Sequence, residues 1–346
     1  MFNELIEALN KVNERLSYFS DFSVNVNHIS IRNVDLRDYI TLRDDEGSGD
    51  EEELTLIDDR YVIKNFSFST SKPESVYAID SSSLRILETD DGFVVAYRIC
   101  IVNYNPSSSN YNVISLGPYL CYLSEWNKVG AYNMARELMN LPPVDIRSTP
   151  SIFKLIDRIR NSFERTIQKL ILKNSINSLV LWDGSLTMGT IDTPKSFMSE
   201  CIDTAFKNNN IIVGISKRSW LKTKSGFRIV SLLSRINRPC YIDIHDYIES
   251  KHPIGGRVYI AKFDINGPSL RVDIAAKPGI NTDEVISMIA TRIPLFNGYP
   301  EPLRLAHMYC YFTNIELLNL EAHALNKIDS ESIEITDWRN VILYPY

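Results

Sequence analysis

The pattern of apolar and polar residues predicts a group of strands followed by a long helix. Short apolar runs at 76–80, 83–88 and 93–102 predict three strands of an antiparallel meander, with the TDDG turn before the third. The segment 151–173 then places apolar side chains at helical spacing, and Ser151, which follows a proline, is typical of a helix N-cap. We therefore expect strands first and a long amphipathic helix after them.

A regular alternation of strand and helix follows the long helix. The run 178–183 (SLVLWD) is short and apolar enough for a buried strand, 194–208 has a helical pattern, and 211–216 (IIVGIS) predicts another buried strand. Strand–helix–strand alternation implies right-handed parallel crossovers. The order β-β-β-α-β-α-β is that of the ribonuclease H-like fold, so we predict an α/β protein with a ribonuclease H-like mixed sheet flanked by helices. Further strands are expected at 257–263 and 270–275, and further helices at 282–292 and 300–311.

The first 70 residues have a different pattern. An amphipathic helix begins the chain, and residues 22–33 and 54–69 alternate apolar and polar residues, as half-buried antiparallel strands do. Between these two segments lies the acidic run DDEGSGDEEE at 44–53, which is typical of a disordered, solvated loop. We predict an N-terminal helix and β-rich extension over 1–70 and the main domain over 71–346.

Composition narrows the class of protein. With 346 residues, of which 44% are hydrophobic and 23% charged, the chain can bury a substantial core. We expect a cytoplasmic protein, because no apolar run is long enough to span a membrane and the mixed-charge start does not resemble a signal peptide. The five cysteines are widely spaced without a CxxC pair, which predicts buried free thiols. The net charge of −6 means that any contact with nucleic acid must come from a local basic surface.

Three carboxylates occupy positions from which they could converge. Asp80 and Asp183 each end a predicted strand, and these strands are neighbours in the expected sheet, so both groups could meet at one edge. Glu164 lies on the helix between them, at the margin of its buried face, where a carboxylate is costly unless something pairs with it. Taken singly, each acid is more often a turn former or a helix-surface residue. Their joint placement favours a shared site.

A divalent cation would resolve the repulsion between three converging carboxylates. Such groups raise one another's pKa values, and a bound cation makes all three favourable as anions. Oxygen ligands select Mg²⁺ or Mn²⁺, and such ions can promote phosphodiester hydrolysis by activating a water. The sequence therefore predicts a metal site for phosphodiester chemistry.

Five motifs stand out along the chain: YAIDSSS (77–83), FERTI (163–167), LVLWDGSL (179–186), VGISKRS (213–219) and GYPEPLRLAHMY (298–309). They resemble those of the NurA family, DNA-end-processing nucleases of archaea and bacteria that work with the HerA translocase. The resemblance covers residues 76–310, and its most specific pair is the DGSL strand end followed about 30 residues later by GISKRS.

The resemblance implies roles for individual residues. It makes Asp80, Glu164 and Asp183 metal ligands, with His307 as a further ligand. It also places Lys217 near the scissile phosphate and lets Tyr299 and His307 complete the site. Lys217 begins a basic cluster that could follow a DNA backbone, formed with Arg218, Lys222, Lys224 and Arg228.

One feature departs from the family pattern. The stretch between Asp80 and Asp183 is longer than in compact members, which suggests an insertion around 104–150. Glu137, in the helical segment 131–140, is therefore a competing candidate for the third carboxylate.

The resemblance also implies an activity and partners. The implied activity is 5′ to 3′ exonuclease and single-strand endonuclease cleavage of single- and double-stranded DNA, dependent on Mn²⁺ or Mg²⁺. The implied oligomer is a homodimer. A further implied partner is the hexameric HerA ATPase, which would feed DNA ends to the nuclease during double-strand break repair by homologous recombination. The resemblance implies no association with a membrane.

Two other readings compete with the nuclease. A catalytically silent paralogue could bind the translocase and DNA as a scaffold. An actin-like ATPase is disfavoured because DSSS and DGSL lack glycine-rich phosphate-binding turns, and the Walker signature is absent. A second metal site in IDIHDYIESKH is disfavoured because strand alternation followed by a loop explains its residues Asp243, His245, Asp246 and His252.

Overall fold

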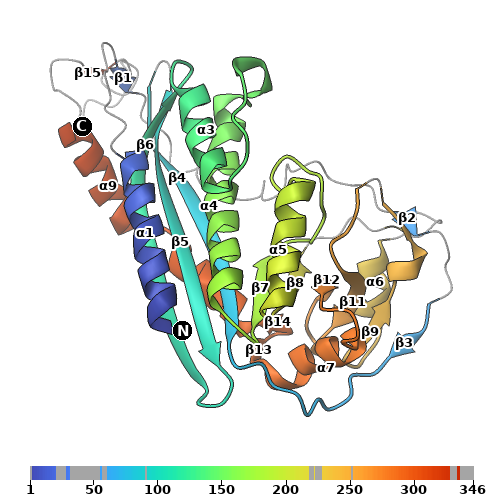
Figure 1. Cartoon of the computed structure of the whole chain (residues 1–346). Coiled ribbons are helices and arrows are strands. Elements are labelled where there is room, and N and C mark those ends of the chain that lie inside the picture. Colours follow the sequence, from blue (N-terminus) through green and yellow to red (C-terminus); the bar gives the residue numbers. More distant parts are fainter. Residues whose placement is uncertain are drawn as a thin grey trace, which may run out of the picture.

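A nine-stranded mixed sheet forms the centre of the protein (Figure 1). The computed structural model describes residues 2–20, 29–31, 55–56, 61–89, 92–217, 222, 228–250, 252–327 and 333–335. From one edge of the sheet to the other, the strands are β3 (Ile63–Lys64), β9 (Cys240–Asp243), β11 (Arg257–Lys262), β12 (Ser269–Ala275), β8 (Ile211–Ser216), β7 (Leu179–Asp183), β4 (Val76–Glu88), β5 (Gly92–Asn105) and β6 (Asn110–Ser124).

Five of these strands have the predicted ribonuclease H-like arrangement. In the order β6-β5-β4-β7-β8, the first three are antiparallel to one another, and β7 and β8 run parallel to β4. Beyond β8 the sheet continues with antiparallel pairing through β12, β11 and β9. The predicted fold class is confirmed, and the extra strands lengthen the sheet on one side.

The predicted division of the meander into strands was wrong. Residues 76–88 form one continuous strand, because the polar DSSS stretch stays paired with β5, with Asp80 opposite Cys100 and Ser81 opposite Ile99. The third strand is β6, which lies within the stretch predicted to be an insertion. Gly117 and Pro118 are typical of turns and concealed this strand, but an edge strand tolerates proline.

Helices cover both faces of the sheet. One face packs against α1 (Phe2–Ser20), α3 (Lys128–Leu138), α4 (Ile152–Asn174) and α5 (Lys195–Lys207), which lie in front of the strands in Figure 1. The other face packs against α7 (Thr282–Arg292) and α8 (Glu301–Cys310). The predicted main-domain helices and strands from residue 151 onward are confirmed to within two residues at each end. The remaining elements are β1 (Ile29–Ile31), β2 (Thr55–Leu56), η2 (Ile146–Ser148), α6 (Ile229–Ser234), η3 (His245–Tyr247), β10 (Ile248–Glu249), β13 (Leu295–Phe296), β14 (Tyr299–Pro300), α9 (Asn314–Lys327) and β15 (Ile333–Ile335).

Strand alternation decides which side chains meet which layer of helices. Ile79 of β4 and Trp182 of β7 belong to the core beneath α4, whereas Ala78 and Leu181 belong to the core beneath α7 and α8. Asp80 of β4 and Asp183 of β7 come next along their strands and therefore face α8. Ser81, which follows Asp80, faces α4.

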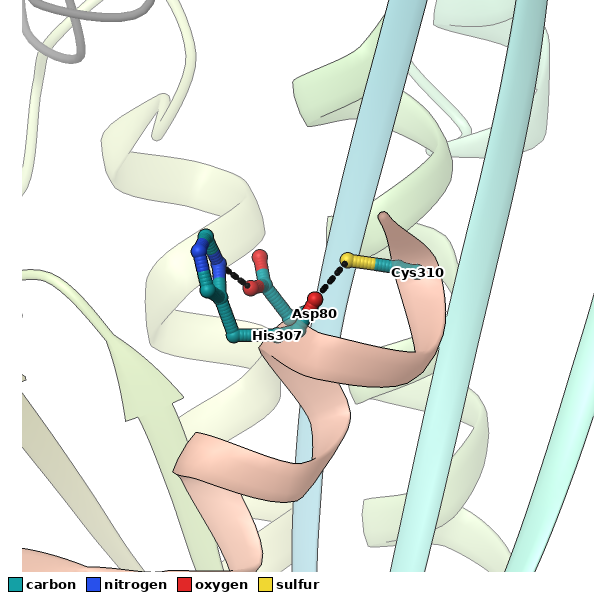
Figure 2. Close-up of side chains that lie close together, drawn as sticks. All are labelled: Asp80, His307 and Cys310. Carbon is teal, nitrogen blue, oxygen red and sulfur yellow. Dashed lines mark hydrogen bonds and ion pairs between the residues drawn. The ribbon is translucent and has the colours of Figure 1, made fainter. Parts of the chain in front are cut away.

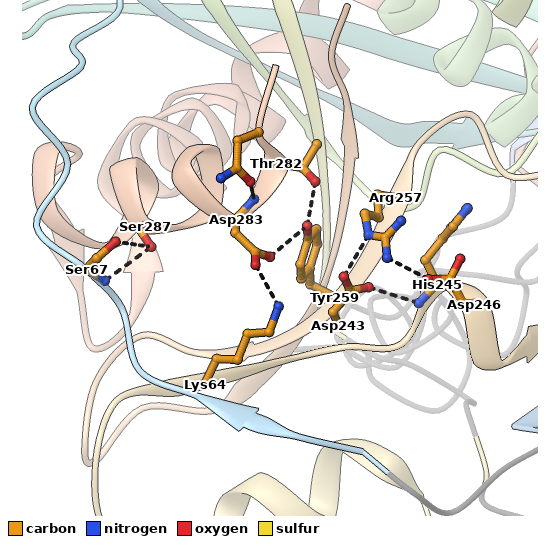
Figure 3. A network of polar contacts seen from close by, with 11 residues as sticks. Lys64, Ser67, Asp243, His245, Asp246, Arg257, Tyr259, Thr282, Asp283 and Ser287 are labelled. Carbon is orange, nitrogen blue, oxygen red and sulfur yellow. Dashed lines mark hydrogen bonds and ion pairs between the residues drawn. The ribbon is translucent and has the colours of Figure 1, made fainter. Parts of the chain in front are cut away.

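The predicted N-terminal extension is described only in part. The acidic run 44–53 and most of 22–33 lie outside the described residues. Within 61–69, only β3 is a strand, and the chain then follows α7, held by an ion pair of 2.6 Å between Lys64 Nζ and Asp283 Oδ2 and a Ser67–Ser287 hydrogen bond (Figure 3). The domain boundary at residue 70 stays a prediction.

The two aspartates of the IDIHDYIESKH segment, Asp243 and Asp246, are ion-paired. Arg257 donates to Asp243 Oδ2 from Nε and to Asp246 Oδ2 from Nη2, both at 2.7 Å (Figure 3). Both carboxylates therefore have a basic partner in the structure.

Two expectations from composition can be compared with the structure. All five cysteines are buried and free, as predicted. No helix in the part of the chain that the structure describes is long and apolar enough to cross a membrane.

The fold makes a testable prediction at Asn210, a buried residue that links α4 to the starts of β7 and β8. Its side chain accepts from Ser178 N at 2.9 Å and donates to the Leu172 and Ser175 carbonyls. Asn210→Ala leaves these buried backbone groups unpaired and should lower the free energy of unfolding by about 3 kcal/mol in urea denaturation. The control Asn174→Ala removes one bond within α4 and should cost about 1 kcal/mol. Equal effects of the two changes would contradict this account.

Candidate active site

Asp80 is a buried carboxylate near the middle of the sheet. It lies on β4, is 6% exposed, and its Oδ1 accepts a hydrogen bond from the Ser81 backbone N–H at 2.8 Å. Its Oδ2 lies 2.8 Å from Nδ1 of His307 on α8 (Figure 2). The His307 side chain is 47% exposed, so this residue connects the buried carboxylate to the surface.

Glu164 is a second buried carboxylate, and a serine joins it to the first. The Ser81 hydroxyl donates to Glu164 Oε2 at 2.6 Å, and Gln168 Nε2 donates to Oε1 at 3.0 Å. Burial raises the pKa of Glu164 to about 7; the negative charge of Asp80 adds to this effect, and Arg165 opposes it. Ser81 therefore binds Asp80 through its backbone and Glu164 through its side chain.

The competing glutamate lies elsewhere. Glu137, on α3, has a side chain that is 75% exposed and forms an ion pair of 3.4 Å with Arg15. The structure thus brings Glu164, and not Glu137, beside Asp80.

Asp183 ends the neighbouring strand β7, at the level of Asp80 on β4. The parallel pairing of β4 with β7 ends at Ile79 and Trp182, so Asp80 and Asp183 are the next residues of two adjacent strands. Asp183 Oδ2 accepts from Lys217 Nζ at 2.8 Å, and this ammonium lies 5.3 Å from the centre of the Tyr299 ring. Asp183, Lys217 and Tyr299 therefore form a contiguous group in which the lysine neutralises the aspartate.

The four predicted metal ligands do not converge on a single point in this structure. In the described part of the chain, the group of three with ligand atoms within 4.8 Å of one another is Asp80, His307 and Cys310. Glu164 adjoins this group across Ser81, and Asp183 is held by Lys217.

Sequence reasoning missed three members of the site: Ser81, Gln168 and Cys310. The cysteine was interpreted only as a buried thiol. The spacing HMYC, with Cys310 three residues after His307, was the available signal, because residues three apart share one face of a helix.

The predicted basic cluster is only partly described. Arg218 and Lys224 lie outside the described residues. Lys222 is half-buried and forms an isolated β-bridge with Arg228. The roles of these three side chains in binding DNA stay predictions.

The residues present fit a divalent cation. Asp80 and Glu164 are both buried and linked through Ser81, and the negative charge of Asp80 acts on Glu164, whose hydrogen bonds come from the neutral donors Ser81 and Gln168. Two buried carboxylates that act on one another repel when both are ionised, and a cation makes both anions favourable. Their oxygen atoms are the ligands that Mg²⁺ and Mn²⁺ prefer.

Comparison with known protein families identifies the chain. A NurA domain matches residues 74–310, which is more than half of the sequence and includes every candidate carboxylate. This chain belongs to the NurA family, a family of nucleases. The resemblance noted from the motifs is therefore confirmed.

Two solved structures that are similar to this NurA protein share little sequence with it. The NurA nuclease from Sulfolobus solfataricus shares 16% sequence identity, with a TM-score of 0.44 over 78% of this chain and 89% of that chain. The catalytic domain of human endonuclease V shares 12% identity, with a TM-score of 0.35 over 72% of this chain and 88% of that one. Among curated proteins, none matches the chain. Family membership rests on the domain match.

The raised pKa of Glu164 predicts how the stability of the metal-free protein depends on pH. Unfolding returns the pKa from about 7 to 4.5, so the unfolded state loses this proton first as pH rises. The free energy of unfolding should therefore fall between about pH 4.5 and pH 7, by about 3 kcal/mol. Glu164→Gln keeps the hydrogen-bonding shape without the charge and should remove this decline.

Urea denaturation at several pH values, with EDTA present, measures the effect. Glu137→Gln is the matched control, because it makes the same change at an exposed carboxylate outside the site. A Glu164→Gln profile identical to that of the unmodified protein would show that Glu164 is not the titrating group.

Proposed function

We propose that this protein is a DNA nuclease that depends on a divalent metal, Mn²⁺ or Mg²⁺. The observation that supports this most directly is the pair of buried carboxylates, Asp80 and Glu164, joined through Ser81 beside the end of β7. In a member of a nuclease family, such a costly arrangement is best explained by a cation that the acids bind.

Each site residue has a proposed role. Asp80, Glu164, Asp183 and His307 would hold the ion. A bound ion would supply activation of a water and stabilisation of the attacking and leaving oxygens of the phosphodiester. His307 is oriented by its contact with Asp80 and, being half-exposed, can exchange protons with solvent.

Lys217 and Tyr299 act on the phosphate side of the proposed site. The Lys217 ammonium is paired with Asp183 and lies over the Tyr299 ring. With Asp183 as a ligand of the ion, Lys217 would be placed to contact the scissile phosphate. Tyr299 keeps the ammonium near the site through a cation–π contact.

The proposal extends to substrate and partners. Family membership supports single- and double-stranded DNA as substrates, 5′ to 3′ exonuclease and single-strand endonuclease activity, and a homodimer. It also supports assembly with the hexameric HerA ATPase in the processing of DNA ends for homologous recombination. Arg218, Lys222 and Lys224 would follow the DNA backbone beyond Lys217.

Cleavage of end-labelled DNA tests the proposed centre. The unmodified protein should degrade DNA with Mn²⁺ or Mg²⁺ and not with EDTA. Asp80→Asn, Glu164→Gln and Asp183→Asn should each lower the rate at least about 100-fold, because each removes a ligand charge. Glu137→Gln is the matched control and should cleave normally.

The same assay separates the alternatives. DNA labelled at the 5′ or the 3′ end reports polarity, and added HerA reports whether the translocase feeds the nuclease. No cleavage under any of these conditions would favour the silent scaffold.

The role of Lys217 makes a separate prediction. Lys217→Met should lower kcat about 100-fold, the loss typical of removing one charge-stabilising group, without weakening Mn²⁺ binding. Lys222→Met should instead weaken DNA binding and reduce its salt dependence, because it removes a backbone contact. Loss of Mn²⁺ binding in Lys217→Met, measured by calorimetry, would contradict the assigned role.

A further inference from the structure

Cys310 is a buried thiol placed against the proposed metal centre. It ends α8, three residues after His307, so both side chains lie on the helix face that meets Asp80 (Figure 2). Its Sγ donates to the His307 carbonyl at 3.3 Å, which keeps the sulfur within the same helical turn. One ligand atom from each of Asp80, His307 and Cys310 lies within 4.8 Å of the other two.

This arrangement distinguishes Cys310 from the other cysteines. All five are buried, yet in the described part of the chain only Cys310 belongs to a group that could hold a metal ion. The negative charges of Asp80 and Glu164 both act on its thiol. A cation placed among these groups would be attracted by the carboxylates and would meet a sulfur on the same side.

We infer that Cys310 is a metal ligand that lets this centre bind softer divalent ions, of the Zn²⁺ and Co²⁺ class, through Asp80, His307 and Cys310. The inference rests on the metal centre of the proposed function. Sulfur and imidazole ligands suit Zn²⁺, whereas Mg²⁺ and Mn²⁺ are bound through oxygens. Three protein ligands leave a fourth position open, as in catalytic zinc sites.

The protons displaced by metal binding and the path of the ion to the site can both be accounted for. A coordinating thiol is deprotonated by the ion, and its proton passes to solvent. His307 binds through Nδ1, the nitrogen that now faces Asp80, and keeps its remaining proton on Nε2. The half-exposed imidazole gives the ion a route from solvent.

Zn²⁺ would compete with Mn²⁺ for the centre of the nuclease. Zn²⁺ and Mn²⁺ share Asp80 and His307, so Zn²⁺ bound with Cys310 should displace Mn²⁺. Removal of the sulfur should weaken Zn²⁺ binding at least about 10-fold and leave Mn²⁺ binding nearly unchanged.

Cobalt spectroscopy of the full chain tests the inference without reference to activity. The metal-free protein is titrated with Co²⁺, whose visible bands report binding and whose near-ultraviolet sulfur-to-cobalt band reports a thiolate ligand. The unmodified protein should show both. Cys310→Ser should keep the visible bands and lose the near-ultraviolet band, whereas the matched control Cys201→Ser, a buried cysteine on α5, should keep both.

A second measurement needs no variant. X-ray absorption of the Zn²⁺-loaded unmodified protein should show one sulfur at about 2.3 Å from zinc. Visible cobalt bands without the near-ultraviolet band, and zinc without sulfur, would overturn the inference while leaving the proposed metal centre intact. No binding of Co²⁺, Zn²⁺ or Mn²⁺ would overturn both.

Discussion

The burial of two neighbouring carboxylates determines the arrangement of this site. Asp80 and Glu164 are each at most 7% exposed, and the hydrogen-bond donors to Glu164 among the described residues are the neutral side chains of Ser81 and Gln168. Ser81 stabilises both acids, by its backbone N–H and by its hydroxyl. Because one residue serves both carboxylates, the position of each acid depends on the course of β4.

The site depends on the continuity of β4, which its pairing with β5 maintains. Successive side chains of a strand point to opposite faces, so Asp80 faces α8 while Ser81 faces α4. A turn at the polar DSSS stretch would separate these two contacts. The sheet therefore brings a helix from each face to one point: α4 supplies Glu164, and α8 supplies His307 and Cys310. The end of β7 adds Asp183 at the same level.

Some of this could be predicted from the sequence because the relevant pattern is local. The apolar runs of β7 and β8 and the helical spacing of α4 depend on neighbouring residues, and they predicted the sheet order and placed Asp80 and Asp183 at adjacent strands. The continuity of β4 and the existence of β6 depend on pairing with β5, a tertiary effect that overrides polar and turn-forming residues. The Lys217–Asp183 pair and the position of Cys310 depend on contacts across distant segments. Only the three-residue spacing from His307 hinted at the cysteine.

The most direct measurement of the central idea, that buried carboxylates hold a divalent ion, is an anomalous diffraction map of crystals loaded with Mn²⁺. A manganese peak in contact with Asp80, Glu164 and Asp183, with Lys217 moved away from the aspartate, is the result expected. A map with no peak at these residues, or with Lys217 still paired to Asp183 and manganese bound elsewhere, would contradict it.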